Sequence, residues 1–162
     1  MCQVDFNDVA SACGGSNTGG NKVLYVSNDG DILDVPDPDV GTSTISADLV
    51  MVAGKVFRKF TFTKQSCQHT EADNEGRNKN SAIVCRIDKD DAVKRHQFEI
   101  MYGGEYTCIL IDGNDLPKIA QGCTFKANFD SGTEETDVNG YEVRFEYTGK
   151  AAKVYTGAIP TT

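Results

Sequence analysis

The chain has 162 residues, of which 39% are apolar and 25% charged, so it is long enough to bury a core, and a single domain over 1–162 is predicted. Acidic residues outnumber basic ones, and the net charge of −8 argues against a nucleic-acid reader, whose affinity for phosphates rests on Lys and Arg. With no apolar run of 18 residues and no basic-then-apolar start, neither a membrane span nor a secretory signal is expected.

Residues 1–21 mix Gly, Asn and Ser with two cysteines and are predicted to form an N-terminal arm, followed by a short strand over 22–27. An acidic stretch comes next, and its first carboxylates, Asp29, Asp31 and Asp34, are weak candidates for a metal site. The EF-hand pattern fails here, because Asp34 stands where that loop needs Gly and no Glu closes it. A solvated loop is therefore the favoured interpretation over a calcium site.

The middle of the chain alternates extended and polar stretches. Residues 49–53 and 55–63 predict two strands or one bent strand, and 82–88 predicts another. Between them, residues 65–81 contain almost no apolar side chain, so a long polar loop is expected there. Such a loop in a compact domain is usually functional or ordered by a partner.

Residues 89–102 predict the one helix, with Asp88 or Asp90 as its cap and Gly103-Gly104 at its end. The predicted sheet-facing residues are Val93, Gln97, Ile100 and Met101, with Ala92 and Phe98 beside them. Beyond the helix, 106–111 predicts a buried strand, 112–115 a turn, and 116–120 a short edge strand because Pro117 cannot donate to a ladder. Residues 150–162 are expected to be a C-terminal extension with a last strand and a free end.

The most informative stretch is 121–149, where apolar and polar residues alternate on both sides of a polar loop. This predicts a hairpin with a long tip, whose apolar face joins the core. The outer face is predicted to be a contact or lumen surface, and its candidates are Lys126, Asn128, Glu142, Arg144 and Glu146. Strands, one helix and more strands together predict an α+β fold: a mainly antiparallel β-sandwich or barrel with one flanking α-helix.

Two patterns raise the question of catalysis. Phe129-Asp130-Ser131-Gly132-Thr133 resembles the motif of aspartic proteases, but only one copy is present, and a turn explains the same residues. Cys67 and His69 could form a nucleophile with its base or half of a metal site, yet a solvated His69 is favoured. We therefore expect no enzyme and no cofactor. The six cysteines form no CxxC pair and are expected to be reduced.

The segments GGNKVLYVS, GKVFRKFTFTK, HQFEIMY, ILIDGND and FDSGTEETDVNGYEVRFEYTG follow one another in an order that resembles structural proteins of tailed bacteriophages of the Bacteroidetes-infecting type. The resemblance is to tail-tube proteins and rests on the order of elements along the whole chain. It implies a small β-sandwich or barrel with one helix.

The same resemblance implies a virion protein, assembled in the host bacterial cytoplasm. Copies would pair with one another into rings, commonly hexameric, that stack as a tail tube and let DNA pass without binding it. Its other partners would be phage tail or head–tail proteins. Two alternatives remain open: another virion component (a head decoration, connector or tail terminator protein), and a calcium-dependent binding module at 29–39.

Overall fold

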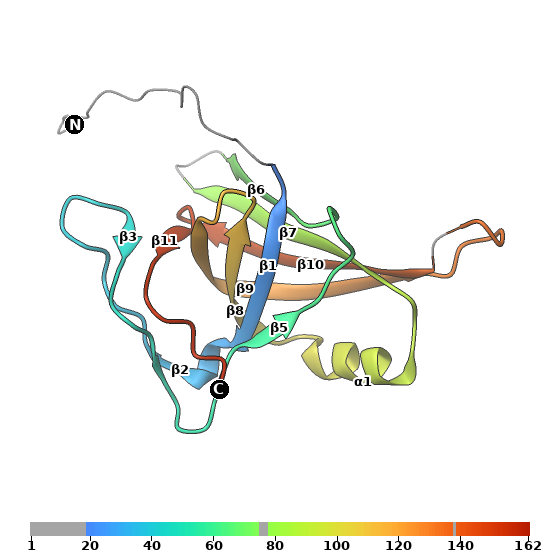
Figure 1. Cartoon of the computed structure of the whole chain (residues 1–162), viewed down its shortest axis with the longest axis horizontal. Helices are drawn as coiled ribbons and strands as arrows, with labels where there is room; N and C mark the ends of the chain where they lie inside the picture. Colours follow the sequence, from blue (N-terminus) through green and yellow to red (C-terminus); the bar gives the residue numbers. More distant parts are fainter. Residues whose placement is uncertain (1–18, 75–77, 138) are drawn as a thin grey trace.

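The computed structural model describes residues 19–74, 78–137 and 139–162, and their main element is one nine-stranded, largely antiparallel sheet (Figure 1). The strand order is β5-β1-β8-β9-β10-β7-β6, with β11 pairing to β9 and β3 to β11, while β2 and β4 form a separate ribbon. The strands are β1 (Asn21–Asn28), β2 (Ile32–Asp34), β3 (Thr44–Ile45), β4 (Val50–Met51), β5 (Arg58–Phe60), β6 (Gln68–Asp73), β7 (Lys79–Asp88), β8 (Glu105–Asp112), β9 (Pro117–Asp130), β10 (Gly140–Gly149) and β11 (Lys153–Tyr155). A 3-10 turn, η1 (Asp29–Asp31), follows β1.

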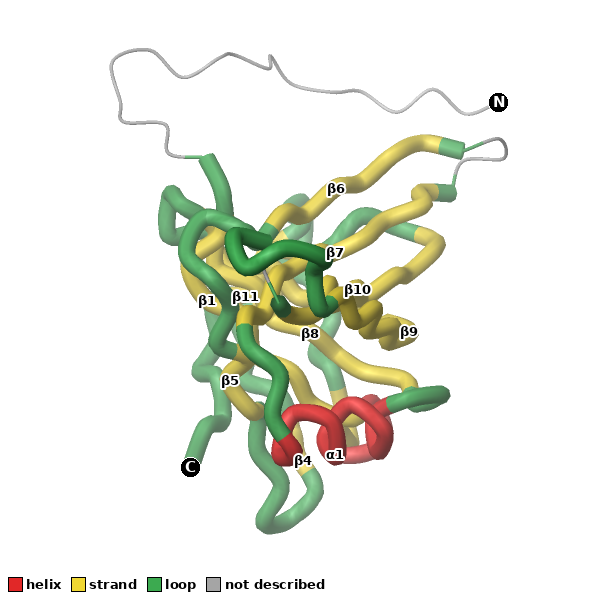
Figure 2. Tube along the Cα trace, turned by 90° about the vertical axis from the view of Figure 1, so that its right-hand side faces the viewer, coloured by secondary structure: helices red, strands yellow, loops and turns green. Residues whose placement is uncertain are grey.

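The α+β prediction is confirmed: the described residues are mainly antiparallel sheet with a single α-helix, α1 (Ala92–Met101), consistent with a β-sandwich. Figure 2 shows α1 lying below the curled sheet, on the side away from β6 and β7. The predicted hairpin over 121–149 is also present as β9 and β10, joined by a long tip.

A bulge in β9 bends the sheet. Tyr106 of β8 is opposite Cys123, and Cys108 is opposite Ala120, so two residues of β9 face one residue of β8 at this point. The second of them, Gly122, has φ 66°, a conformation that favours glycine. Before the bulge β9 pairs with β11, and after it with β10. The bend lets one continuous sheet enclose a core.

The main core fills the inside of this curved sheet and contains the inward residues of the predicted hairpin. Phe145 is fully buried, with ring centroids 5.4 Å from Phe125 and 5.7 Å from Phe60. On the helix, Phe98 packs between Phe125 and Tyr141, with centroids 5.6 and 4.7 Å away. These contacts fix the helix against the β9–β10 pair.

A second, smaller core lies on the other face of β8. Ile109 and Tyr155 are fully buried there, together with Ile45, Leu49, Phe57 and Ile119. Because Cys108 and Leu110 enter the main core while Ile109 enters the second, β8 is buried on both faces. This double burial explains the nearly continuous apolar run YTCILI, in which Thr107 is the one polar residue.

The helix differs from its prediction in bounds, cap and face. It begins at Ala92, and its cap is Asp91, whose carboxylate accepts a hydrogen bond from the Lys94 backbone N at 2.8 Å. The predicted face is wrong in part, because Val93 and Ile100 are 71% and 63% exposed. The residues that pack on the sheet are Phe98 and Met101. The large Phe98 ring sets the orientation of the helix, since it packs against Phe125 of β9 and Tyr141 of β10.

Three further predictions are corrected. Residues 65–81 are not one loop, because β6 and the start of β7 lie within them as a hairpin. Residues 116–120 are not an edge strand: Pro117 opens β9, which has neighbours on both sides. The tail is not free, because Tyr155 is fully buried and Phe57 N donates to Pro160 O at 2.8 Å. Of the predicted arm, 1–18 lie outside the described residues, and Asn21 already belongs to β1.

Candidate functional site

The outer face of the β9–β10 hairpin brings the predicted assembly residues together in one ladder. Arg144 is directly opposite Lys126, and Glu142 is opposite Asn128. On its other side β10 pairs with β7, where Glu142 is opposite Arg86. Their side chains all leave the sheet on the face away from the core, since Phe125, Val143 and Phe145 between them are buried.

Two like charges therefore face each other in the middle of this surface, and carboxylates bridge them. Glu146 accepts from Lys126 Nζ at 3.0 Å and from Arg144 Nε at 3.2 Å. Glu142 lies 3.4 Å from Arg144 Nη1 on the other side. The hydrogen bond from Lys126, helped by Arg144, holds the pKa of the Glu146 carboxyl below its usual range. The surface is thus charged but internally balanced.

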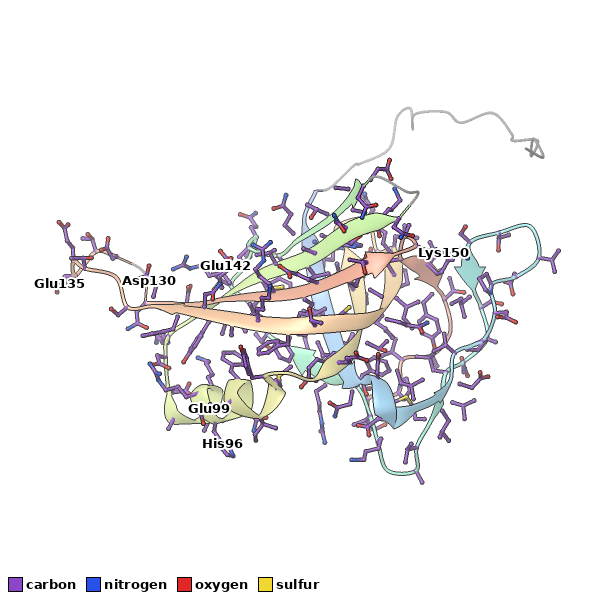
Figure 3. All side chains as sticks on the ribbon, turned by 180° about the vertical axis from the view of Figure 1, so that it is seen from behind. His96, Glu99, Asp130, Glu135, Glu142 and Lys150 are labelled. Atoms are coloured by element: carbon purple, nitrogen blue, oxygen red, sulfur yellow. The ribbon has the colours of Figure 1, made fainter. Side chains whose placement is uncertain are left out.

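Asn128 extends this surface toward the hairpin tip. Its side chain is exposed, and it lines a shallow hollow with Arg86, Asp130 and Glu142. Figure 3 shows Glu142 on the face of the sheet opposite the helix. His96 and Glu99, which lie on the helix, point the other way. The five predicted residues therefore share one continuous polar face.

The hairpin tip projects beyond the body of the molecule, with Asp130 at its root and Glu135 near its end (Figure 3). Asp130 Oδ1 accepts from Gly132 N at 2.9 Å, and Asp137 accepts from the backbone N of Thr133 and Glu134 at 2.7 and 2.9 Å. These bonds lower the pKa of the Asp137 carboxyl. The carboxylates of the protease-like motif and its neighbourhood thus shape turns.

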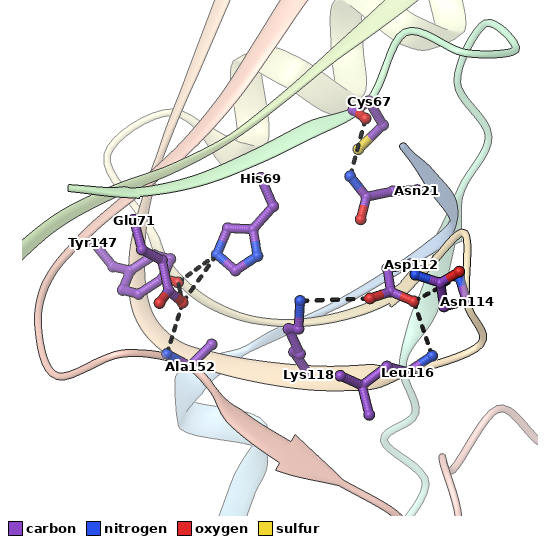
Figure 4. A network of polar contacts seen from close by, with 10 residues as sticks. All are labelled: Asn21, Cys67, His69, Glu71, Asp112, Asn114, Leu116, Lys118, Tyr147 and Ala152. Carbon is purple, nitrogen blue, oxygen red and sulfur yellow. Dashed lines mark hydrogen bonds and ion pairs between the residues drawn. The ribbon is translucent and has the colours of Figure 1, made fainter. Parts of the chain in front are cut away.

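A polar network inside the sheet was missed by sequence reasoning (Figure 4). His69 Nε2 lies 2.6 Å from Tyr147 Oη, and Tyr147 Oη donates to Glu71 Oε1 at 3.0 Å. The same carboxylate oxygen accepts from Ala152 N at 2.9 Å. The expectation of a solvated His69 is wrong, because its side chain is only 9% exposed.

Burial lowers the pKa of His69, and Lys118 adds to that effect, while Glu71 opposes it. Desolvation and the charge of Glu71 raise the pKa of Tyr147 above its usual range. The network therefore joins β6, β10 and the start of the C-terminal segment. Its His69 imidazole is neutral near neutral pH. The only signal for this network in the sequence was the spacing of His69 and Glu71, which puts both side chains on the same face of a strand.

Two of the three metal candidates, Asp29 and Asp31, are engaged by other side chains. Asp29 accepts a hydrogen bond from Thr107 Oγ1, and Asp31 lies 3.9 Å from Lys55 Nζ and accepts from Asn28 Nδ2 at 3.3 Å. Asp34 is exposed on β2. Over residues 19–74, 78–137 and 139–162, no three acidic, His or Cys side chains come close enough together to hold a metal ion.

Comparison with known proteins returns no matching family model, no matching curated protein and no matching solved structure. In the described part of the chain, no helix has the length and apolar character needed to cross a bilayer. The class that the fold defines is therefore an antiparallel β-rich α+β domain with one charged, solvent-facing sheet surface.

Proposed function

We propose that this chain is a virion structural protein, the subunit of a phage tail tube that stacks as rings around a channel for DNA. The observation that carries the proposal is the unpaired edge that β5 and β6 each present. Among the described residues, β5 pairs only with β1, and β6 only with β7, so each of these two strands has one edge without a paired strand. The residues that join them contact both neighbours, since Asn21 Nδ2 donates to Cys67 O at 2.9 Å and Thr63 N donates to Arg86 O at 2.7 Å. Unpaired edges are templates for a further strand. The free edges of β5 and β6 lie on opposite sides of one stretch, 58–73, so a contact that joins the β5 edge of one copy to the β6 edge of the next is head-to-tail, and such contacts close into rings.

The outer hairpin face fits a surface that DNA slides past. Its two central cations, Lys126 and Arg144, are both engaged by Glu146. DNA affinity depends on cations that are free to replace counterions at phosphates. A balanced face on a protein of net charge −8 would therefore pass DNA without holding it.

The projecting hairpin tip supplies a contact along the axis of a stack. It extends beyond the body and carries Asp130, Glu134, Glu135 and Asp137 without a basic residue over 130–137. A projecting acidic tip also suits contact with a different protein rather than with a second copy of this chain. The second candidate is therefore another virion component: a head decoration, connector or tail terminator protein. These candidates differ in whether the chain assembles with itself.

Sedimentation velocity over a range of concentrations tests the proposal. The wild-type chain should form species of ring size or larger as concentration rises. Glu142→Lys places a third cation beside Arg144 and Arg86. It should raise the concentration needed for self-assembly at least about tenfold, which is a loss of roughly 1.4 kcal/mol of association free energy. Circular dichroism should show an intact fold, because the site is on the outer face.

Glu99→Lys is the matched control, since it makes the same charge change on the exposed face of α1 (Figure 3). It should leave assembly unchanged. If both variants assemble as the wild type does, the outer hairpin face is no contact surface. If the wild type stays monomeric at every concentration, the tube proposal fails and the second candidate is favoured.

A further inference from the structure

Two thiols meet inside the protein at its open edge. Cys67 precedes β6, Cys85 lies in β7, and their sulfur atoms are 2.7 Å apart. Both side chains are buried in the main core, at 4% and 1% exposure. Among the described residues β6 pairs only with β7, so this contact holds an edge strand that has a single neighbouring strand.

The strand register places these two residues face to face. The β6–β7 ladder runs in constant register from Gln68 opposite Val84, so the preceding pair is Cys67 opposite Cys85. Disulfides require Cβ atoms that point toward each other at short range. Facing positions on neighbouring antiparallel strands meet that requirement when the side chains share a face, as these do.

Backbone hydrogen bonds show that this is a non-hydrogen-bonded pair. Cys67 O accepts from Asn21 Nδ2 at 2.9 Å, so its carbonyl is turned away from β7 (Figure 4). The next residue of β7 is Arg86, whose N donates to Ser66 Oγ and whose O accepts from Thr63 N, so its backbone groups are directed toward the stretch that precedes β6. Because successive residues of a strand direct their backbone groups to opposite sides, the Cys85 amide is directed toward β10. Side chains of such pairs approach more closely, with Cα atoms about 4.5 Å apart, within the range that disulfides span.

The other buried thiols lack this arrangement. Cys108 and Cys123 also interact, but Cys108 is opposite Ala120 and Cys123 is opposite Tyr106, so the two are diagonal across the β9 bulge. The Cys123 thiol donates to Ala120 O at 3.7 Å. Facing register thus singles out Cys67 and Cys85.

We propose that Cys67 and Cys85 are a site of oxidative modification, at which a cross-strand disulfide fastens edge strand β6 to β7. The inference does not depend on the proposed function. The oxidant is a small disulfide such as oxidised glutathione. One cysteine thiolate attacks it, releasing one glutathione, and the second cysteine attacks the mixed disulfide, releasing the other. The two protein sulfurs lose two electrons, and the two thiol protons end on the released glutathiones.

Burial controls the rate of this reaction. The contact with Cys67, together with desolvation, holds the pKa of the Cys85 thiol far above its ordinary value, so little thiolate is present in the folded state. The oxidant reaches the site only when β6 separates from β7. Oxidation of the folded chain should therefore be slow, and mild denaturant should accelerate it at least about tenfold, because local opening governs access.

Peptide mapping tests the proposal directly. The full chain is equilibrated with oxidised glutathione, alkylated and digested with trypsin, which places the four buried cysteines in separate peptides, 65–77, 80–86, 96–118 and 119–126. The two cysteines near the start of the chain, Cys2 and Cys13, share peptide 1–22. The expected product links 65–77 to 80–86 and disappears with reductant.

Thermal unfolding supplies the second readout. The oxidised chain should melt roughly 5–10 °C above the reduced one, because the bond closes a short loop in the unfolded state. Cys67→Ser should abolish both the link and the shift, while Cys123→Ser should keep both. If Cys67→Ser does not fold, the wild-type map alone decides. Absence of the 65–77/80–86 link at equilibrium, or an oxidised chain with unchanged melting, overturns the proposal.

Discussion

Phe125 and Phe145 lie directly opposite each other in the β9–β10 ladder, with ring centroids 5.4 Å apart inside the core. The same register sets Lys126 opposite Arg144 on the outer face, one residue later in β9 and one residue earlier in β10. A slip of one residue would turn every side chain to the wrong face. The buried aromatic pair therefore determines which charges meet on the candidate assembly surface.

Truncating Phe145 to Ala should cost about 3–5 kcal/mol of unfolding free energy, because the ring is fully buried and contacts several other rings. Phe129→Ala removes the same atoms from a residue that is 41% exposed and should cost roughly 1 kcal/mol. Urea denaturation of both variants measures the difference. Equal losses would show that the hairpin core is packed differently.

Replacing Gly140 by Ala should destabilise the β7–β10 pairing, because an added Cβ would lie 2.5 Å from Ile87 O. Backbone atoms must shift to relieve that contact, and we expect a cost of about 1–3 kcal/mol. Gly30→Ala is the control, since nothing lies within 4 Å of its added Cβ. Thermal melting compares them, and an unaffected Gly140→Ala protein would contradict the close approach of these strands.

Acid should weaken the fold partly through His69. Its pKa in the folded state is lowered by burial, against about 6.5 in the unfolded chain, so the unfolded chain takes up the proton first. This contribution to stability is present above pH ~6.5 and is lost as pH falls through the lower folded value. The charged and titratable groups that act on the ring are Glu71, Lys118 and Tyr147.

The measurement is the melting temperature at about pH 8 and about pH 5 for three proteins. The wild type should lose more than His69→Gln, which carries no proton-binding ring at that position. His96→Gln, at the exposed helix site, should behave like the wild type. An identical acid response of His69→Gln and wild type would exclude the buried imidazole as a cause.

The C-terminal segment should be essential to the second core. Tyr155 is fully buried, accepts from Leu49 N at 3.2 Å and donates to Ala158 O at 2.6 Å. Tyr155→Ala should lose roughly 3–5 kcal/mol by urea denaturation, as for other buried aromatic residues. Tyr155→Phe should lose only about 1–2 kcal/mol, since it keeps the ring and lacks the hydroxyl. A harmless Tyr155→Ala would mean that the tail is free after all.

Sequence patterns predicted the elements that carry a local signal. Alternation over Phe125–Phe145 and the turn at Asn139-Gly140 are enough to indicate the hairpin, and the outer residues follow from the same period. The run YTCILI indicates a buried strand. All five outer-face candidates lie on one surface because strand alternation alone places them there.

The predictions that failed depend on distant partners. Residues 68–73 look like loop because β6 is an edge strand whose Gln68 and Thr70 face solvent, and only its pairing with β7 makes it a strand. Tyr155 is buried by residues far away in the sequence, which no local pattern reveals. The helix face was wrong in part, because the contacts of Phe98 with Phe125 and Tyr141 set the rotation of the helix and leave Val93 and Ile100 exposed.

Negative-stain electron microscopy of the purified chain at high concentration tests the central claim most directly. We predict rings of uniform diameter, some stacked into hollow tubes, with Glu142→Lys giving fewer rings than Glu99→Lys at equal concentration. A field of single small particles for the wild type, at every concentration and salt condition, would contradict the proposal that this chain builds a tube.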